Sequence, residues 1–345
     1  METVIMYALF AVGVVLVIKG GDWFVDGASW IAEVTGIPKF IVGATIVSFA
    51  TSLPEIIVSS IAAVEGHSIL MEGVGDFVAA SQDRVGMAIG NGVGSVICNT
   101  AMIMGIGIIF MPTEIDRKKF SRKSVLLGVS LVALLVLTRF GSLSTKGAIF
   151  LLAIFVAYIV ENFKSSKSDS LDDDSDYDLP QVDKKTVTKN ILSTALGGIC
   201  LVGGSQLLVK GGGEIARSWG VSESIVGVTM LAIGTSLPEL VTAISAIVKK
   251  QPTMSVGNVI GANIIDTAFI LPLCSFIYGD TLPVSAQNIY LDFPVCILVS
   301  LIALVPTVLA KKFYRWQGVV LLLVYLVYLA IVSVGLEKYL SLFNI

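Results

Sequence analysis

Long apolar runs separated by short polar segments give this chain its pattern. The runs fall at about 3–34, 38–64, 86–111, 124–139, 146–162, 190–217, 222–248, 253–278, 287–309 and 316–336. A helix of about 20 apolar residues crosses the hydrocarbon layer of a bilayer, and most of the runs approach or exceed that length. Several runs are interrupted by glycines and polar residues, as the broken helices of transporters are. The pattern predicts an all-α membrane protein with ten transmembrane helices.

The composition agrees with this prediction. Hydrophobic residues make up 55% of the 345 residues and charged residues only 14%, which excludes a soluble globular protein and makes the lipid bilayer its surroundings. The four cysteines lie in apolar runs without metal-like spacing, so we expect no disulfide and no cofactor. A single histidine leaves no zinc site or histidine base for a hydrolase. We predict no enzyme and no nucleic-acid partner, and no feature of the sequence sets an oligomeric state.

The distribution of lysine and arginine among the loops predicts the orientation. If the N-terminus is outside, the inner loops hold 16 of these residues and the outer segments hold 5. Cytoplasmic loops carry the excess of lysine and arginine in membrane proteins. We therefore expect a protein of the cell (plasma) membrane with both termini outside.

The second half of the chain repeats the first. Gly43 and Glu55 match Gly227 and Glu239 at an offset of 184 residues. With five runs in each half, the second half enters the membrane in the opposite orientation, an arrangement typical of transporters. The predicted organisation is a first five-helix repeat at 1–163, an acidic cytoplasmic linker at 164–188 and a second, inverted five-helix repeat at 189–345.

A second pair of matching segments has a shorter offset. The segment from Gly90 to Asn99 matches the segment from Gly257 to Asp266 at 167 residues, so the first half carries about 17 extra residues. We place them at 65–86 and predict a solvated outside loop in which His67 is exposed. An acidic vestibule that concentrates cations is the alternative for this loop.

Both halves carry the sequence Thr-Ser-Leu-Pro-Glu, which ends at Glu55 and at Glu239. A carboxylate at membrane depth costs about 2.5–3.5 kcal/mol on insertion scales, so it persists where it faces a cavity or a partner. Pro54 and Pro238 have no N–H, so each frees a helical carbonyl one turn earlier. Hydroxyls, carbonyls and a carboxylate together suit hard cations such as Ca²⁺ and Na⁺. We interpret the two copies as two halves of one cation site.

Two further polar residues occupy equivalent places. Asn99 and Asp266 add a neutral and a charged oxygen donor to Glu55 and Glu239. The formal charge of the four side chains is −3 when all acids are ionised, so one Ca²⁺ leaves −1 and three Na⁺ leave zero. Carboxylates in one such site titrate as a coupled group.

Two acids also lie inside the first run. Asp22 and Asp26 are four residues apart, and we expect them near the membrane boundary beside a basic partner. Lys210 occupies the place equivalent to Asp26 in the second half and is the candidate partner. A position on the ion pathway is the alternative. The glycines spaced four apart, Gly90 with Gly94 and Gly257 with Gly261, are expected to let helices pack closely.

These paired motifs resemble the cation/calcium antiporter superfamily, and within it the prokaryotic sodium/calcium exchangers. The resemblance extends from Gly20-Gly21-Asp22-Trp23 to Arg315-Trp316-Gln317-Gly318. It implies that Glu55 and Glu239 form the central pair that binds Ca²⁺ and is also used by Na⁺, flanked by Asn99 and Asp266. It also implies carbonyl ligands at Thr51, Thr235, Ser48 and Ala232, and hydroxyl ligands of Na⁺ at Ser52, Ser236 and Ser95. Ala262 stands where such exchangers often carry a serine matching Ser95, and Ser48 where a small apolar residue is usual, so both bear on the number of Na⁺ ions.

The resemblance also implies a mechanism. Three Na⁺ or one Ca²⁺ would occupy the same region from either side of the membrane in turn, by alternating access. Three alternatives stay open at this point: a proton/calcium exchanger, a potassium-dependent sodium/calcium exchanger, and a cation channel. The proton/calcium branch tends to carry a glutamate in the Gly-Asn segment, where this chain has Ser95 and Asn99 in one copy and Ala262 and Asp266 in the other.

Overall fold

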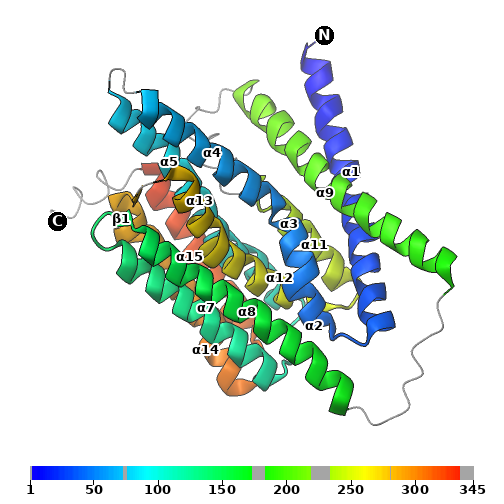
Figure 1. The fold of residues 1–345 in the computed structure, drawn as a ribbon. Helices are drawn as coiled ribbons and strands as arrows, with labels where there is room; N and C mark the ends of the chain where they lie inside the picture. Colours follow the sequence, from blue (N-terminus) through cyan, green and yellow to red (C-terminus); the bar gives the residue numbers. More distant parts are fainter. Residues whose placement is uncertain (1, 73–75, 173–182, 219–233, 280, 335–345) are drawn as a thin grey trace. The chain divides into compact units, whose positions relative to one another are not determined.

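The computed structural model describes residues 2–72, 76–172, 183–218, 234–279 and 281–334, which form helices and one short pair of strands (Figure 1). Nine of the described helices are long and apolar enough to cross a membrane. They match nine of the ten predicted runs. The remaining run, at 222–248, lies outside the described residues up to 233 and is represented by a shorter apolar helix, α11 (Leu237–Val248).

The chain divides into two compact units. Unit 1 comprises Met1–Leu53 and Ile159–Ala262, and unit 2 comprises Pro54–Tyr158 and Asn263–Ile345. Each unit takes segments from both halves of the sequence. The units are therefore not the two predicted repeats.

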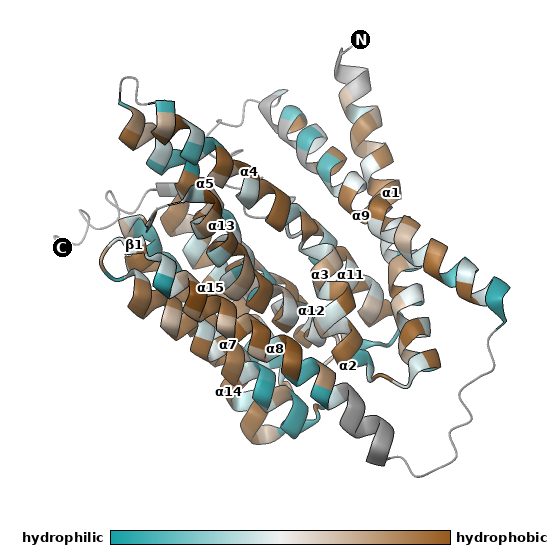
Figure 2. Cartoon of the chain, in the orientation of Figure 1, coloured by the Kyte–Doolittle hydropathy of each residue, from teal (hydrophilic) through white to brown (hydrophobic). Residues whose placement is uncertain are grey.

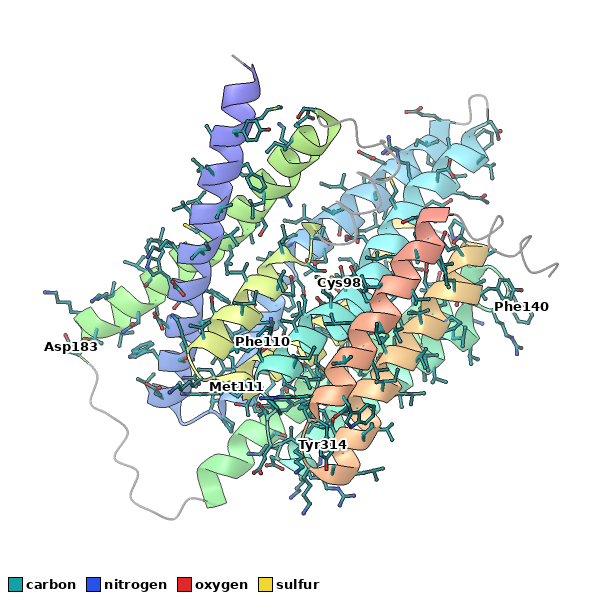
Figure 3. The ribbon with its side chains drawn as sticks, turned by 180° about the vertical axis from the view of Figure 1, so that it is seen from behind. Cys98, Phe110, Met111, Phe140, Asp183 and Tyr314 are labelled. Carbon is teal, nitrogen blue, oxygen red and sulfur yellow. The ribbon has the colours of Figure 1, made fainter. Side chains whose placement is uncertain are left out.

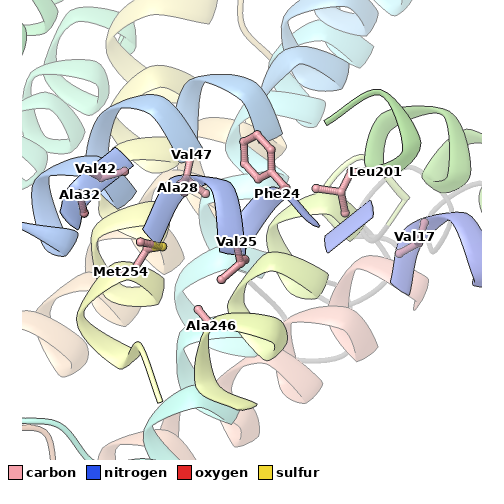
Figure 4. Close-up of a cluster of buried hydrophobic side chains, with 10 residues drawn as sticks. All are labelled: Val17, Phe24, Val25, Ala28, Ala32, Val42, Val47, Leu201, Ala246 and Met254. Atoms are coloured by element: carbon pink, nitrogen blue, oxygen red, sulfur yellow. The ribbon is translucent and has the colours of Figure 1, made fainter. Parts of the chain in front are cut away.

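Unit 1 is built mainly from long helices that pack through glycine. Its described elements are α1 (Glu2–Thr35), α2 (Lys39–Val42), η1 (Gly43–Val47), α3 (Ser48–Thr51), α9 (Lys184–Ser218), α11 and most of α12 (Pro252–Ile265). A hydrophobic cluster joins α1, η1, α9, α11 and α12, with Phe24, Val25 and Leu201 among its members (Figure 4).

A glycine seam holds α1 against α9. A Cβ atom at Gly20 would lie 2.8 Å from the carbonyl oxygen of Gly197, and one at Gly13 would lie 3.0 Å from that of Gly204. The contacting glycines recur every seven residues on each helix, at 13, 20 and 27 on α1 and at 197, 204 and 211 on α9. Small residues at this spacing let two backbones approach closely along one line.

The acids of α1 have a different partner from the one predicted. Lys249 Nζ lies 2.6 Å from Asp26 Oδ1 and 3.8 Å from Asp22 Oδ1, and it donates to the Asp22 carbonyl oxygen at 2.7 Å. The prediction that Lys210 is the partner was wrong, because Lys249 ends α11 and α11 packs directly on α1. The expectation of a basic partner was correct.

Unit 2 contains the remaining helices. Its elements are α4 (Leu53–Glu72, from Pro54 on), α5 (Phe77–Ile97), η2 (Cys98–Met104), α6 (Gly105–Phe110), α7 (Arg117–Thr138), β1 (Ser142–Leu143), the first half of α8 (Thr145–Asp172), η3 (Asp266–Ile270), α13 (Leu271–Tyr278), β2 (Leu282–Pro283), η4 (Asn288–Asp292), α14 (Phe293–Ala310) and α15 (Arg315–Val334). The helix surfaces carry many apolar side chains, as lipid-facing surfaces do (Figure 2).

Loops predicted on one side of the membrane pair with each other in unit 2. Strands β1 and β2 are antiparallel, with Ser142 opposite Pro283, so the α7–α8 turn lies beside the segment after α13. At the other end of the helices, Ile115 N–H donates to the Lys311 carbonyl oxygen at 2.9 Å. Figure 3 shows Phe140 and Tyr314, which mark these two ends. The pairings agree with the predicted alternation of the spans.

The extra residues of the first half are helical. Helix α4 continues to Glu72 and α5 begins at Phe77, so the predicted loop at 65–86 was wrong for the helical residues 65–72 and 77–86, and 73–75 lie outside the described residues. Polar bonds stabilise these extensions: Arg84 Nη1 lies 3.5 Å from Glu65 Oε2, and His67 Nδ1 lies 2.7 Å from the Tyr278 carbonyl oxygen. His67 is half-buried, contrary to the prediction.

The linker between the two halves is shorter than predicted. Helix α8 reaches Asp172 and α9 begins at Lys184, with 173–182 outside the described residues.

Candidate cation site

Both copies of the Thr-Ser-Leu-Pro-Glu motif break the helix at the serine. Ser52 has φ −80° and ψ 4°, and Ser236 has φ −84° and ψ 6°. These angles lie in the sparsely allowed bridge region where irregular and functional residues are common. A proline follows two residues later in each copy, which removes the N–H that would continue the helix. The predicted helix interruptions are therefore confirmed, and the two copies share one backbone conformation.

The two glutamates begin the helices that follow the breaks. Glu55 is the third residue of α4 and is 1% exposed, and Glu239 is the third residue of α11 and is 0% exposed. The N-terminal turn of a helix presents free N–H groups and a positive partial charge, which favour an anion. Each buried carboxylate is thus held where the backbone itself compensates its charge.

In unit 1, Glu239 lies against the first motif. Ser52 Oγ donates to Glu239 Oε1 at 3.4 Å. Glu239 Oε2 is buried and has no hydrogen-bond partner among the described residues. Leaving a buried polar atom unsatisfied costs about 1–3 kcal/mol, and native proteins rarely do so without a reason. The oxygen is therefore available to a cation.

A polar chain fixes the position of the first motif in unit 1. Thr51 Oγ1 donates to Asn258 Oδ1 at 3.3 Å, and Asn258 Nδ2 donates to Thr242 Oγ1 at 3.1 Å. Thr242 in turn donates to the carbonyl oxygens of Pro238 and Glu239. Sequence analysis did not assign a role to Asn258 or Thr242. The repeated Gly-Asn dipeptide was the signal for Asn258.

In unit 2, Glu55 lies against α5. Ser95 Oγ donates to Glu55 Oε1 at 3.5 Å, and Asn91 Nδ2 donates to the Glu55 carbonyl oxygen at 3.3 Å. Asn91 also donates to Ser59 Oγ at 2.9 Å, which binds α5 to the first two turns of α4. The contact between Ser95 and Glu55 agrees with the predicted grouping, while the positioning residue Asn91 was not predicted.

Asn99 and Asp266 both lie in wide, π-helical turns. Asn99 is the second residue of η2 and Asp266 the first residue of η3, and both side chains are 1% exposed. Single π-helical turns inside α-helices occur frequently at functional sites. Asn263 Nδ2 donates to Thr100 Oγ1 at 2.7 Å, which joins the two segments. Neither side-chain atom of Asn99 has a hydrogen-bond partner in the described part of the chain.

The predicted residues thus form two groups of buried oxygen donors, one in each unit. Unit 1 holds Ser48, Thr51, Ser52, Thr235, Ser236 and Glu239; unit 2 holds Glu55, Ser95, Asn99 and Asp266. Ala232 lies outside the described residues. Among the described residues, no three aspartate, glutamate, histidine or cysteine side chains gather into one metal site. Hydroxyl, amide and carboxylate oxygens fit Na⁺ and Ca²⁺.

Comparisons with known proteins decide the family. The profile of the sodium/calcium exchanger protein family matches residues 5–164 and 189–334. The chain belongs to this family. It is 29% identical to the sodium/calcium exchanger MaX1 of Methanosarcina acetivorans, over 94% of this chain and 97% of that protein. It is 33% identical to the inner membrane protein YrbG of Escherichia coli, over 86% of each.

A solved structure agrees with this assignment. The sodium–calcium exchanger NCX_Mj, soaked with 10 mM Na⁺ and no Ca²⁺, superimposes with a TM-score of 0.79 at 27% identity, over 95% of this chain and 99% of that one. The chain is therefore a membrane protein of a family of cation/Ca²⁺ exchangers, which are transporters and not enzymes. The resemblance stated from the motifs is confirmed.

Proposed function

We propose that this chain exchanges Na⁺ for Ca²⁺ across the cell membrane by alternating access, with three Na⁺ moving against one Ca²⁺. The two groups of oxygen donors are the two halves of one cation site, which holds Ca²⁺ or Na⁺ but not both sets at once. Glu55 and Glu239 are its central ligands, and Asn99 and Asp266 flank them.

The bond from Ser52 to Glu239 is the observation that carries this proposal. Ser52 is three residues before Glu55, at the break that precedes α4. The acid of the second motif thus contacts the first motif only three residues along the chain from the acid of the first. Two ligands of one Ca²⁺ each lie 2.3–2.6 Å from the ion, so their carboxylates must be neighbours.

The remaining donors fit the two cargoes. Ser52, Ser95 and Ser236 supply hydroxyls, and the broken helix ends supply carbonyl oxygens, which coordinate Na⁺ in interrupted transporter helices. Ala262 is buried and has no hydroxyl to match Ser95, so a carbonyl or a water completes that Na⁺ position. With three ionised acids, Ca²⁺ leaves one negative charge and three Na⁺ leave none.

The charge difference makes the exchange electrogenic. One net charge moves in each cycle, which is worth about 2.3 kcal/mol for every 100 mV. At a negative-inside potential this favours Ca²⁺ extrusion. The ten spans form two inverted five-helix repeats, at 1–163 and 189–345, joined by the cytoplasmic segment 164–188. The excess of lysine and arginine on one set of loops supports placing both termini outside.

Calcium uptake into proteoliposomes loaded with Na⁺ tests the proposal. We expect uptake that needs the Na⁺ gradient and speeds up when the interior is made positive by a potassium diffusion potential, because each uptake cycle moves one net positive charge outward. Glu55→Gln and Glu239→Gln should lower the uptake rate at least 100-fold. Asp292→Asn is the matched control, because Asp292 is a buried acid of unit 2 outside both donor groups, bound by Asn288 and Tyr328.

The other outcomes separate the alternatives. Uptake driven by a pH gradient alone would assign the chain to proton/calcium exchange, with Asp266 as the first candidate for the proton carrier. Uptake that requires K⁺ together with Na⁺ would assign it to potassium-dependent exchange. Ca²⁺ flux without any counter-ion would identify a channel and refute alternating access.

A further inference from the structure

An apolar groove runs between α7 and α14 in unit 2. It encloses about 260 Å³ and is lined along α7 by residues from Ser121 to Val132 and along α14 by residues from Ile297 to Leu309. Its walls are aliphatic apart from Ser121, Ser124 and Ser300, with Gly128 at the middle of the α7 side. The twelve residues of α7 extend about 16 Å along the helix axis at 1.5 Å per residue. One leaflet of hydrocarbon is about 15 Å thick, so the groove has the length of one leaflet.

Positive charge gathers at one end of this groove. Segments 111–124 and 310–316 hold eight basic residues and only two acids, Glu114 and Asp116. The two segments are joined, since Ile115 N–H donates to the Lys311 carbonyl oxygen at 2.9 Å and Phe313 N–H donates to the Thr113 carbonyl oxygen at 3.0 Å. We call the exposed side chains of these segments the basic cluster: Arg117, Lys118, Arg122, Lys311, Lys312 and Arg315. Figure 2 shows hydrophilic colour where α7 begins and hydrophobic colour along its middle.

The groove opens directly onto the basic cluster. On α7, Ser121 of the groove is adjacent to Arg122 and one turn after Lys118. On α14, Leu309 of the groove is two residues before Lys311. Ser121 places a hydroxyl at the junction of the two regions. An apolar slot of leaflet length thus ends in a cluster of cations at the membrane surface.

We propose that this groove binds one acyl chain of an anionic phospholipid, whose phosphate lies against the basic cluster. Basic pockets between transmembrane helices on the cytoplasmic side are suited to acidic lipid head groups. The acyl chains of neutral and anionic lipids fill the groove equally well. The charge of the head group, which the basic cluster attracts, therefore determines which lipid binds. The side of the membrane follows from the same excess of basic residues, which places the site in the inner leaflet.

Photo-crosslinking of the intact protein in bilayers tests the proposal. The wild-type chain is reconstituted in phosphatidylcholine with a trace of phosphatidylglycerol that carries a diazirine on its acyl chain, and crosslinked peptides are mapped by mass spectrometry. We expect peptides covering 121–132 and 297–309 to be labelled at least fivefold more by this probe than by the matching phosphatidylcholine probe. Excess unlabelled phosphatidylglycerol should remove the signal.

Two variants separate the acyl chain from the head group. Gly128→Leu fills the groove, and no described atom lies within 4 Å of a Cβ atom at Gly128, so the larger side chain enters without a backbone clash. It should reduce labelling at least fivefold, whereas Val129→Phe, on the exposed face of α7 outside the groove, should not. The double variant Lys118→Gln, Lys312→Gln should remove the preference for the anionic probe.

Several results would overturn the proposal. They are equal labelling by the two probes in the wild type, labelling spread over all lipid-facing helices, and labelling unchanged in Gly128→Leu. Should Gly128→Leu not fold, competition by unlabelled phosphatidylglycerol in the wild type decides alone: labelling that does not compete refutes a site. The test does not depend on ion transport.

Discussion

The segment from α2 to α3 packs against α12 through two glycines, Gly43 and Gly257. Neither position has room for a side chain. A Cβ atom at Gly257 would overlap the carbonyl oxygen of Phe40, and a Cβ atom at Gly43 would overlap that of Met254. Both obstacles are backbone atoms, so rotation of a side chain does not relieve them. Replacing Gly257 by alanine must therefore push the segment from α2 to α3 away from α12.

The structure sets the expected size of this effect. Overpacking a tight contact costs about 1–3 kcal/mol. The bonds from Thr51 to Asn258 and from Ser52 to Glu239 measure 3.3 Å and 3.4 Å, so a further displacement of a few tenths of an ångström breaks both. Each is worth about 1 kcal/mol. Alanine regains up to about 1 kcal/mol in helix propensity. We expect Gly257→Ala to lower the free energy of unfolding by about 1–4 kcal/mol.

Thermal unfolding and Ca²⁺ uptake together measure this effect. A loss of 1 kcal/mol lowers Tm by about 2–4 °C in a domain of 150–250 residues, so a decrease of several degrees is expected. The uptake rate should fall as well, because Ser52 no longer meets Glu239. Gly198→Ala is the matched control, since its Cβ atom would lie 3.6 Å from the Phe24 ring, which is ordinary contact. Equal Tm and equal uptake in the two variants would refute the reasoning.

Two further predictions concern contacts within single units. In a double-mutant cycle, Lys249→Ala and Asp26→Ala should show a coupling of about 0.2–1 kcal/mol that decreases with added salt, because Asp26 is 68% exposed on its side chain. A coupling above about 3 kcal/mol, typical of buried pairs, would contradict this exposure. His67→Ala should lower the free energy of unfolding by about 1 kcal/mol through loss of its bond to the Tyr278 carbonyl oxygen, as measured by Tm in detergent. An unchanged Tm would mean that the bond does not stabilise the C-terminal ends of α4 and α13.

The site motifs were predictable because they repeat. A carboxylate, a proline and two hydroxyls in an apolar run are informative when they occur twice at matching places, and the structure gives both copies the same break at Ser52 and Ser236. The asparagines that hold the motifs were not predicted. Asn91 and Asn258 act through contacts with residues 16 to 207 positions away along the chain, so the repeated Gly-Asn dipeptide marks them without showing their partners.

Hydropathy marks the membrane and not the ends of helices. The polar residues between 65 and 86 suggested a loop, yet α4 and α5 extend through most of this segment. A helix that leaves the bilayer needs polar partners, and Glu65 with Arg84 and His67 with the α13 end supply them. The predicted partner of Asp26 was wrong for a related reason. Asp26 and Lys210 occupy equivalent positions in the sequence repeat, but only the packing of the helices shows that Lys249 is the side chain that meets Asp26.

The spacing of the α1–α9 glycines was present in the sequence and was not used. Gly13, Gly20 and Gly27 recur every seven residues, as do their equivalents 184 residues later. A periodic pattern of small residues predicts a packing line in the same way as a pattern of large ones. The two lines meet each other because the helices run antiparallel, with Gly13 beside Gly204 and Gly20 beside Gly197.

Two of the three boundaries between the two units fall inside the motifs themselves, and the third lies within α8. The chain passes from unit 1 to unit 2 between Leu53 and Pro54, and again between Ala262 and Asn263. Glu55 and Asp266 are therefore only two and four residues beyond a boundary. In the proposed exchange, a change at either boundary reaches these ligands directly through the backbone. The break at Ser52 and the π-helical turn at Asp266 are the places where regular helix hydrogen bonding is already interrupted.

Restoring the helix at the first boundary tests this role. Pro54→Ala supplies the N–H that Ala50 lacks one turn earlier, so the segment gains a helical hydrogen bond worth about 1 kcal/mol and favours a continuous helix. Because the carboxylate of Glu55 is retained, we expect the exchange rate to fall more than the affinity for Ca²⁺. Uptake rates at saturating and limiting Ca²⁺ separate the two quantities. If the maximal rate is unchanged while the affinity falls, the proline positions a ligand and the break is not a hinge.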